Sequence, residues 1–150
     1  RHRIRPSNAN ESSKEGRRAK YIMKFSYQLF RGSYYPIIPI TLVKDSKKIT
    51  TSAVVDSGAS VSIFQGSFGR LINIDVEAGE KHIFQGASAK LVGYIHNIRV
   101  IIVDKEVECR VAFSDELSTS FNLLGRETIF ENFKVCFDET EKLVEFIDKT

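Results

Sequence analysis

The chain of 150 residues is long enough for one moderate hydrophobic core, and its net charge is +3. Hydrophobic residues make up 42% and charged residues 27%, as in ordinary globular proteins, and no apolar stretch reaches the roughly 20 residues of a membrane helix. The charge is uneven, because residues 1–20 hold seven basic and two acidic side chains and the remaining 130 residues therefore sum to −2. This distribution argues against a basic, nucleic-acid-binding domain.

Residues 1–20 are predicted to be a flexible basic tail or linker, and residues 21–150 a single domain. The tail has Ile4 as its only large aliphatic side chain, so it cannot bury enough apolar surface to offset the entropy of ordering. A basic arm can contact nucleic acid or acidic lipid. Because aromatic residues that would stack on bases are missing from it, a solvated linker is favoured over a nucleic-acid-binding arm.

From residue 21 onward the pattern is one of short strands. Apolar runs alternate with turn-forming residues such as Arg31-Gly32-Ser33 and the polar segment 44–48. Pro36 and Pro39 suit an edge position or a strand end. In chain order the prediction is strands over 22–30, 35–43, 49–55 and 61–64, followed by a short helical turn over 65–71.

The second half of the chain continues this pattern. Predicted strands cover 82–88, 90–96, 98–103, 107–113, 121–126, 133–137 and 143–147, with a short helix over 127–133. Asp104-Lys105-Glu106 and the polar segment 138–141 are predicted hairpin turns, and Glu127 suits the first turn of the helix. Many short strands with at most two short helices indicate an all-β fold, either a small barrel or a sandwich.

The two cysteines, Cys109 and Cys136, lie in alternating apolar segments without metal-like spacing. Buried free thiols are favoured, and a disulfide between neighbouring strands stays open as the alternative. This favours a reducing, cytoplasmic location without deciding it. His82 and His96 also lack partners at metal-ligand spacing, so no metal and no cofactor are expected.

A carboxylate follows directly on an apolar strand in the segment Asp56-Ser57-Gly58-Ala59-Ser60. Such triplets commonly mark ordinary turns, in which the Asp caps its own backbone. Here, however, Ala53-Val54-Val55 precedes the Asp, and further apolar residues follow from Val61, so the carboxylate must be desolvated or must point into a cleft. A carboxylate at the mouth of a water-poor site is suited to general acid–base hydrolysis.

A second motif, Asn122-Leu123-Leu124-Gly125-Arg126, precedes the predicted second helix. Together with Asp56-Ser57-Gly58 it resembles the retropepsins, the single-lobed aspartic peptidases typified by retroviral proteases. The order of strand, Asp loop, flap region, Leu-Leu-Gly-Arg segment, helix and terminal hairpin extends the resemblance over about residues 35–147. The resemblance implies an all-β fold with a small closed β-barrel-like lobe, a flap hairpin and one or two short helices.

The resemblance also implies roles for particular residues. Asp56 would be catalytic, supported in its loop by Ser57, Gly58, Ala59 and Ser60. Packing beside that loop would come from Leu123, Leu124, Gly125 and Arg126. The flap that closes over substrate would fall at 82–94, with Gly86, Ala87 and Ser88 at its tip, where small residues let a peptide backbone approach.

The implied activity is that of an aspartic endopeptidase acting on a peptide or protein substrate. In that chemistry two facing carboxylates share a proton, one activating the water and the other polarising the scissile carbonyl. The chain has one Asp-Ser-Gly loop and is too short for a two-lobed enzyme. Asp56 would therefore have to meet Asp56 of a second copy across a homodimer.

Two departures from the family pattern leave an alternative open. Ser57 replaces the usual Thr but keeps the hydroxyl that would bond across the dimer. Ser60 stands where retroviral enzymes often have an Asp that pairs with the arginine matched by Arg126, so Arg126 needs another partner or faces solvent. The charged C-terminal hairpin also differs from the dimerising strand of viral enzymes. The alternative is a catalytically silent retropepsin-fold module for dimerisation or peptide binding.

Overall fold

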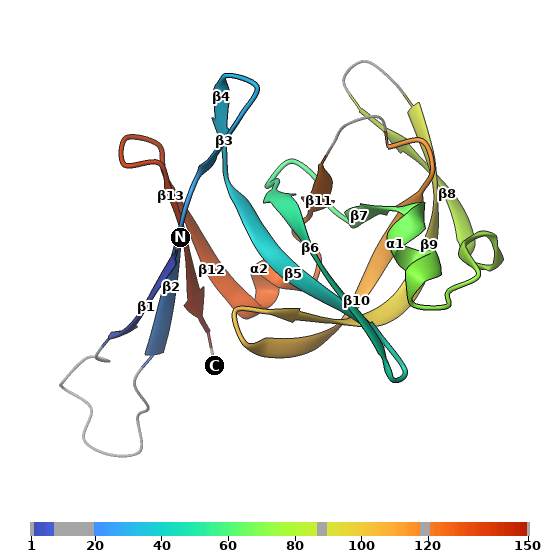
Figure 1. The fold of residues 1–150 in the computed structure, drawn as a ribbon, viewed down its shortest axis with the longest axis horizontal. Coiled ribbons are helices and arrows are strands. Elements are labelled where there is room, and N and C mark those ends of the chain that lie inside the picture. The colour runs from blue at the N-terminus through green and yellow to red at the C-terminus, as the bar shows by residue number, and fades with distance from the viewer. Residues whose placement is uncertain (1, 8–19, 87–89, 118–120, 150) are drawn as a thin grey trace. The chain divides into compact units, whose positions relative to one another are not determined.

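The computed structural model describes residues 2–7, 20–86, 90–117 and 121–149, with side chains from residue 22 onward (Figure 1). The chain divides into two compact units. Residues 1–37 and 130–150 form the first unit, and residues 38–129 form the second. Among the described residues, no helix has the length and hydrophobicity needed to span a bilayer.

The second unit is built on a closed β-barrel of six strands. In order around the ring, these are β10 (Lys105–Ser114), β7 (Ser62–Gln65), β11 (Asn122–Leu124), β6 (Lys47–Val55), β5 (Ile37–Lys44) and β9 (Lys90–Ile102), and β9 pairs again with β10. Strand β8 (Glu80–Gln85) extends the sheet by pairing with the N-terminal part of β9. Between β7 and β8 lie helix α1 (Gly66–Leu71) and the 3₁₀-helix η1 (Val76–Ala78). The predicted all-β barrel with short helices is confirmed.

Two parallel pairings distinguish this barrel from a simple meander. Strand β11 runs parallel to β6, with Leu124 opposite Val55, and β7 runs parallel to β10. Figure 1 shows the short β11 beside β6. Because parallel strands end at the same edge, the loops that follow Val55 and Leu124 leave the barrel side by side.

The barrel closes because its strands bury alternate side chains on one face. In β5, Ile38, Ile40 and Leu42 are at most 1% exposed, whereas Pro39 between them points outward. Phe64 of β7 and Phe113 of β10 complete the core with ring centroids 6.3 Å apart. Each such large side chain contributes roughly 1.5–3 kcal/mol by leaving water. The barrel is therefore a packed scaffold for the loops at its edges.

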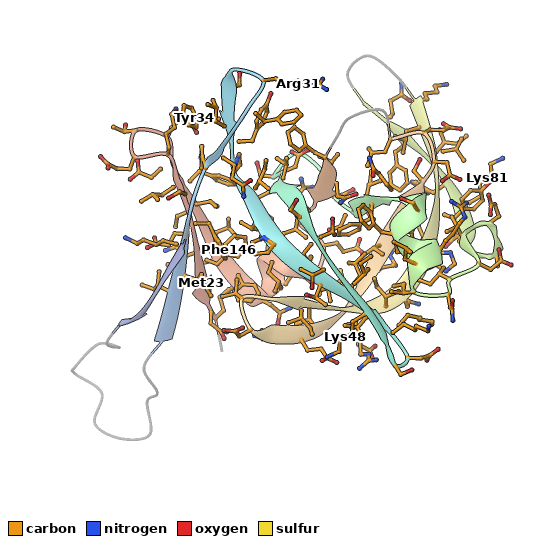
Figure 2. All side chains as sticks on the ribbon, in the orientation of Figure 1. Met23, Arg31, Tyr34, Lys48, Lys81 and Phe146 are labelled. Carbon is orange, nitrogen blue, oxygen red and sulfur yellow. The ribbon has the colours of Figure 1, made fainter. Side chains whose placement is uncertain are left out.

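The first unit contains a four-stranded antiparallel sheet in the order β1 (His2–Ser7), β2 (Lys20–Ser26), β13 (Leu143–Asp148) and β12 (Phe133–Asp138). A separate hairpin joins β3 (Gln28–Phe30) to β4 (Ser33–Tyr35), and the short helix α2 (Ile129–Asn132) precedes β12. One face of the sheet buries Met23, Phe25, Phe133 and Phe146. Met23 and Phe146 are register partners on neighbouring strands (Figure 2). The ring of Phe146 packs edge to face against those of Phe25 and Phe133.

Residues 2–7 correct one expectation. They were expected to belong to a flexible segment, but they pair with residues 20–25 as strand β1. Strand pairing uses the N–H and C=O groups of the backbone, so polar and basic side chains do not prevent it. The outer edge of β2 provides the N–H and C=O groups with which β1 pairs. Residues 8–19, the rest of the predicted tail, lie outside the described residues, so the 1–20 and 21–150 division stays a prediction.

Several element boundaries also differ from the sequence prediction. The two strands predicted over 90–96 and 98–103 are one strand of 13 residues, β9, because Asn97 stays in the ladder opposite Arg110. The hairpin turn after β9 lies at Val103-Asp104, one residue earlier than predicted, and both residues adopt positive φ. Helix α2 spans only Ile129–Asn132, so Glu127 precedes its first turn.

The two cysteines form no disulfide. Cys109 is buried and Cys136 half-buried, and both are free thiols.

The strand predicted over residues 22–30 is divided at Tyr27, where β2 ends and β3 begins. Tyr27 is only 7% exposed, its amide donates to the carbonyl of Lys142, and its hydroxyl donates to Glu139 Oε1 at 3.1 Å. Tyr27 thus continues the alternation of buried side chains that Met23 and Phe25 begin in β2.

Tyr27 gives the first unit a pH dependence at the alkaline end. Burial, and then the hydrogen bond to Glu139, raise the pKa of Tyr27 from 10.0 to about 12. The folded pKa is the higher one, so this contribution is complete below pH 10 and is lost as pH rises through 12. We expect the free energy of unfolding to fall by about 3 kcal/mol more in wild type than in Tyr27→Phe over this range, measured by urea denaturation. Tyr34→Phe, on an exposed side chain, is the matched control and should keep the wild-type slope.

Candidate active site

The Asp56 loop leaves the barrel at the end of β6. Val55 is 4% exposed, Asp56 is half-buried, and Ser57, Gly58 and Ser60 are exposed. The Asp56 carboxylate accepts a hydrogen bond from the amide of Gly58 through Oδ1 at 2.9 Å. A Cβ on Gly58 would stand 3.2 Å from the same oxygen. The loop therefore bends back over the carboxylate, which is the local turn expected of an Asp-Ser-Gly triplet.

The segment after β11 holds this loop through its backbone. The amide of Asp56 donates to the carbonyl of Leu124 at 2.9 Å, and the amide of Arg126 donates to the carbonyl of Ala59 at 2.9 Å. The amide of Glu127 donates to the carbonyl of Ser60 at 2.8 Å. These bonds join the Asp56 loop to the segment that follows β11. The two sequence motifs, 69 positions apart, therefore lie side by side.

Gly125 lies at the closest approach between the two segments. A Cβ there would be 2.8 Å from the carbonyl carbon and 2.9 Å from the carbonyl oxygen of Val61, so the backbone leaves no room for a side chain. The amide of Gly125 donates to Ser62 Oγ at 2.9 Å, and Ser62 is 1% exposed. The Gly125 amide thus finds its hydrogen-bond acceptor in the hydroxyl of a buried side chain, Ser62.

Arg126 has the alternative partner that the replacement at position 60 requires. Its Nη1 donates to the carbonyl oxygen of Ser57 at 2.6 Å, and the side chain of Ser60 is exposed. A guanidinium that donates to a backbone carbonyl thus joins the start of the Asp56 loop to the segment after Gly125. The Ser57 hydroxyl remains at the surface.

A cleft of about 600 Å³ lies beside the loop. The Asp56 loop and β7 form one side of it, and β11 contributes Leu123. The lining comprises Asp56, Gly58, Ala59, Ser60, Val61, Ile63, His82, Ile83, Phe84, Gln85, Gly86, Lys90, Leu91, Glu116, Leu117 and Leu123. The Asp56 carboxylate therefore lies in a cleft, as its apolar flanks predicted.

An apolar floor underlies the cleft. Val61, Ile63, Ile95 and Ala112 are at most 9% exposed, and the half-buried Phe84, Leu91 and Leu117 pack against them. Polar side chains also line the cleft, among them Lys90 and Glu116.

A hairpin forms the other wall at the position predicted for the flap. Residues 80–85 of β8 pair antiparallel with 90–95 of β9, and Phe84 lies opposite Leu91. The ring of His82 packs against Phe84 with centroids 4.6 Å apart. Lys81 lies on β8 near the base of this hairpin, opposite Tyr94 (Figure 2). Gly86 lines the cleft, whereas the predicted tip residues Ala87 and Ser88 lie outside the described residues.

Several site residues escaped the sequence analysis. Ser62 accepts the hydrogen bond from the Gly125 amide across 63 residues of sequence. The segment Ser114–Leu117 was not singled out, although Glu116 and Leu117 line the cleft. No local pattern marks these residues, since each acts on a segment that only the barrel brings near. Among the described residues, no group of three or more His, Cys, Asp or Glu side chains could hold a metal ion.

Ser62 provides a test of how the loop is held. We expect Ser62→Ala to lower the free energy of unfolding by about 1–3 kcal/mol, because the buried Gly125 amide loses its acceptor. Urea denaturation measures the change. Ser60→Ala alters an exposed hydroxyl in the same loop and should stay within about 0.5 kcal/mol of wild type. Equal stability of the two variants would contradict the assigned role of Ser62.

Comparison with known proteins finds similar structures, whereas the two sequence comparisons find no match. No protein-family model matches the sequence, and no curated protein matches it either. Among solved structures, the chain is similar to a retropepsin-like aspartic protease from Rickettsia conorii, with a TM-score of 0.62 and 17% identity. That match covers 86% of this chain and 93% of the other.

Two viral proteases are also similar, at lower TM-scores. The EIAV protease has a TM-score of 0.48 at 14% identity, over 69% of this chain and 92% of its own. The simian foamy virus protease has a TM-score of 0.39 at 14% identity, over 60% and 87%. The likeness to the Rickettsia protein, together with the closed barrel described above, identifies the fold of this chain as retropepsin-like.

Proposed function

We propose that this protein is an aspartic endopeptidase whose catalytic dyad consists of Asp56 from each of two identical chains. The observation that carries the proposal is the place of the Asp56 carboxylate. It lies in a cleft of about 600 Å³ with an apolar floor, on a loop that four hydrogen bonds join to Leu124, Arg126 and Glu127. A fixed carboxylate in a cleft with an apolar floor suits hydrolysis of a peptide bond.

In the proposed reaction the two carboxylates share one proton. One carboxylate takes a proton from the attacking water while the protonated partner donates a hydrogen bond to the scissile carbonyl and stabilises the developing oxyanion. Asp56 is the one Asp among the described residues that line the cleft, and the second carboxylate is proposed to come from the partner chain. Glu116 also lines the cleft, and its Oε1 accepts the hydrogen bond from the Val92 amide.

The surroundings of Asp56 suit a symmetric partner. Ser57, Gly58 and Ser60 form an exposed rim next to the half-buried carboxylate. A small exposed rim allows two such loops to approach closely about a two-fold axis, where the Ser57 hydroxyl would bond to the partner's loop. The β8–β9 hairpin is proposed to act as the flap that covers a bound peptide. No cofactor is needed for this reaction.

Asp56→Asn tests the catalytic role. Asn keeps an oxygen that can accept from the Gly58 amide, so the loop should retain its shape while the general base is lost. We expect cleavage of a peptide library to fall by at least about 10²–10³-fold across pH 3–8. Asp104→Asn makes the same chemical change in the exposed turn after β9 and should retain wild-type activity. Undiminished cleavage by Asp56→Asn would refute the proposal.

Mixing variants tests whether two chains form one site. At a fixed total concentration, an equal mixture of wild type and Asp56→Asn that has exchanged subunits contains about a quarter wild-type dimers. The cleavage rate should therefore fall to about a quarter of the all-wild-type rate. A rate of one half would mean that a single chain is catalytically sufficient. Dimer mass in solution with pepstatin binding but no cleavage would instead support the silent binding module.

A further inference from the structure

The ladder between β9 and β10 ends before the two strands do. Its last pair is Tyr94 opposite Phe113, and β10 ends at Ser114. Strand β9 begins earlier, at Lys90, and this first part pairs with β8 on its other side. In the same register, the next positions would pair Gly93 with Ser114 and Val92 with Asp115, but β10 ends at Ser114.

Side chains replace the missing backbone partners of Val92. The amide of Val92 donates to Glu116 Oε1 at 2.9 Å, and the carbonyl of Val92 accepts from Ser114 Oγ at 2.5 Å. Ser114 Oγ also accepts from the amide of Glu116 at 3.0 Å. Ser114 is 1% exposed, whereas Glu116 is exposed. We call this pair of side chains, Ser114 and Glu116, the Val92 clamp.

The residue between the two clamp side chains is fixed in turn to helix α1. Asp115 receives two hydrogen bonds from Arg70, both at 2.8 Å, and this bidentate bond holds the pKa of Asp115 below its usual value. A Cβ at Gly66 would collide with the Asp115 carboxylate, so a glycine allows this approach. The segment that carries the Val92 clamp is therefore held in place by its hydrogen bonds to helix α1.

The Val92 clamp lies at the point where the β8–β9 hairpin leaves the barrel to line the cleft. Val92 pairs with Ile83, and the next pairs, Phe84 with Leu91 and Gln85 with Lys90, all line the cleft. On the other side of Val92, Gly93 is packed on the barrel, where a Cβ would be 3.4 Å from the carbonyl of Phe113. Val92 is thus the residue at which the hairpin leaves the barrel.

We propose that Glu116 is a positioning residue that anchors the β8–β9 hairpin at Val92 and thereby sets the hairpin's height over the apolar floor. The Glu116 carboxylate accepts the hydrogen bond from the Val92 amide, and this bond keeps β9 beside the end of β10. The consequence for peptide binding rests on the proposed peptidase function, whereas the anchoring itself does not. A hairpin that spends less time in the closed arrangement lowers the apparent affinity for peptide in proportion to the closed fraction.

Hydrogen exchange of the full chain, followed residue by residue by NMR, tests the anchoring. In Glu116→Ala the Val92 amide should exchange about tenfold faster, because a bond to a charged acceptor is lost. Glu116→Gln keeps an accepting oxygen and should restore slow exchange. Glu106→Ala is the matched control, since it removes an exposed carboxylate paired with Arg99 at the far end of the same two strands. Its Val92 amide should exchange as in wild type.

Peptide cleavage tests the consequence for binding. Glu116→Ala should raise KM about three- to tenfold with kcat nearly unchanged, and Glu116→Gln should return KM toward wild type. Unchanged exchange at Val92 in Glu116→Ala, or equally fast exchange in Glu116→Gln, overturns the anchoring role. A fall in kcat at constant KM overturns the link to peptide binding. If wild type cleaves no peptide, the peptidase proposal fails, and the exchange rates alone decide the role of Glu116.

Discussion

The parallel pairing of β11 with β6 is the constraint on which the candidate site depends. Both strands end at the same edge of the barrel, so the Asp56 loop and the segment after Leu124 emerge next to each other. Their backbones then come too close for any side chain at Gly125, and the buried Ser62 hydroxyl accepts the Gly125 amide. The position of the Asp56 carboxylate is therefore set by main-chain geometry.

The same barrel supplies the rest of the cleft. Strands β7, β9 and β10 contribute the buried apolar floor, and β8 with the start of β9 forms a hairpin over it. The segment Ser114–Leu117 takes part in both, because Leu117 packs on the floor while Glu116 holds Val92 of the hairpin. A change in this segment would alter packing and hairpin position together. The stability of the barrel edge and the shape of the cleft are thus coupled through a few residues.

Much of the fold followed from local patterns. Alternation and turn residues predicted most of the strands, since side-chain burial on one face of a strand is a short-range signal. The patterns failed where pairing partners decide the structure. Strand β1 is polar and basic and is a strand because of its neighbour β2, and β9 stays continuous through Asn97 because β10 accompanies it. The turn at Val103-Asp104 has positive φ at a β-branched residue, which composition argues against.

For the candidate site, the amino-acid sequence indicated which residues take part. The apolar flanks of Asp56 required its carboxylate to be desolvated or to point into a cleft, and Leu123-Leu124-Gly125-Arg126 indicated the segment beside it. Only the tertiary structure decided the partners: the Ser57 carbonyl for Arg126, Ser62 for Gly125 and Glu116 for Val92. The physical reason is distance along the chain. Burial and turn preferences act over a few residues, whereas these hydrogen bonds join segments between 24 and 69 residues apart, which meet only after the barrel has closed.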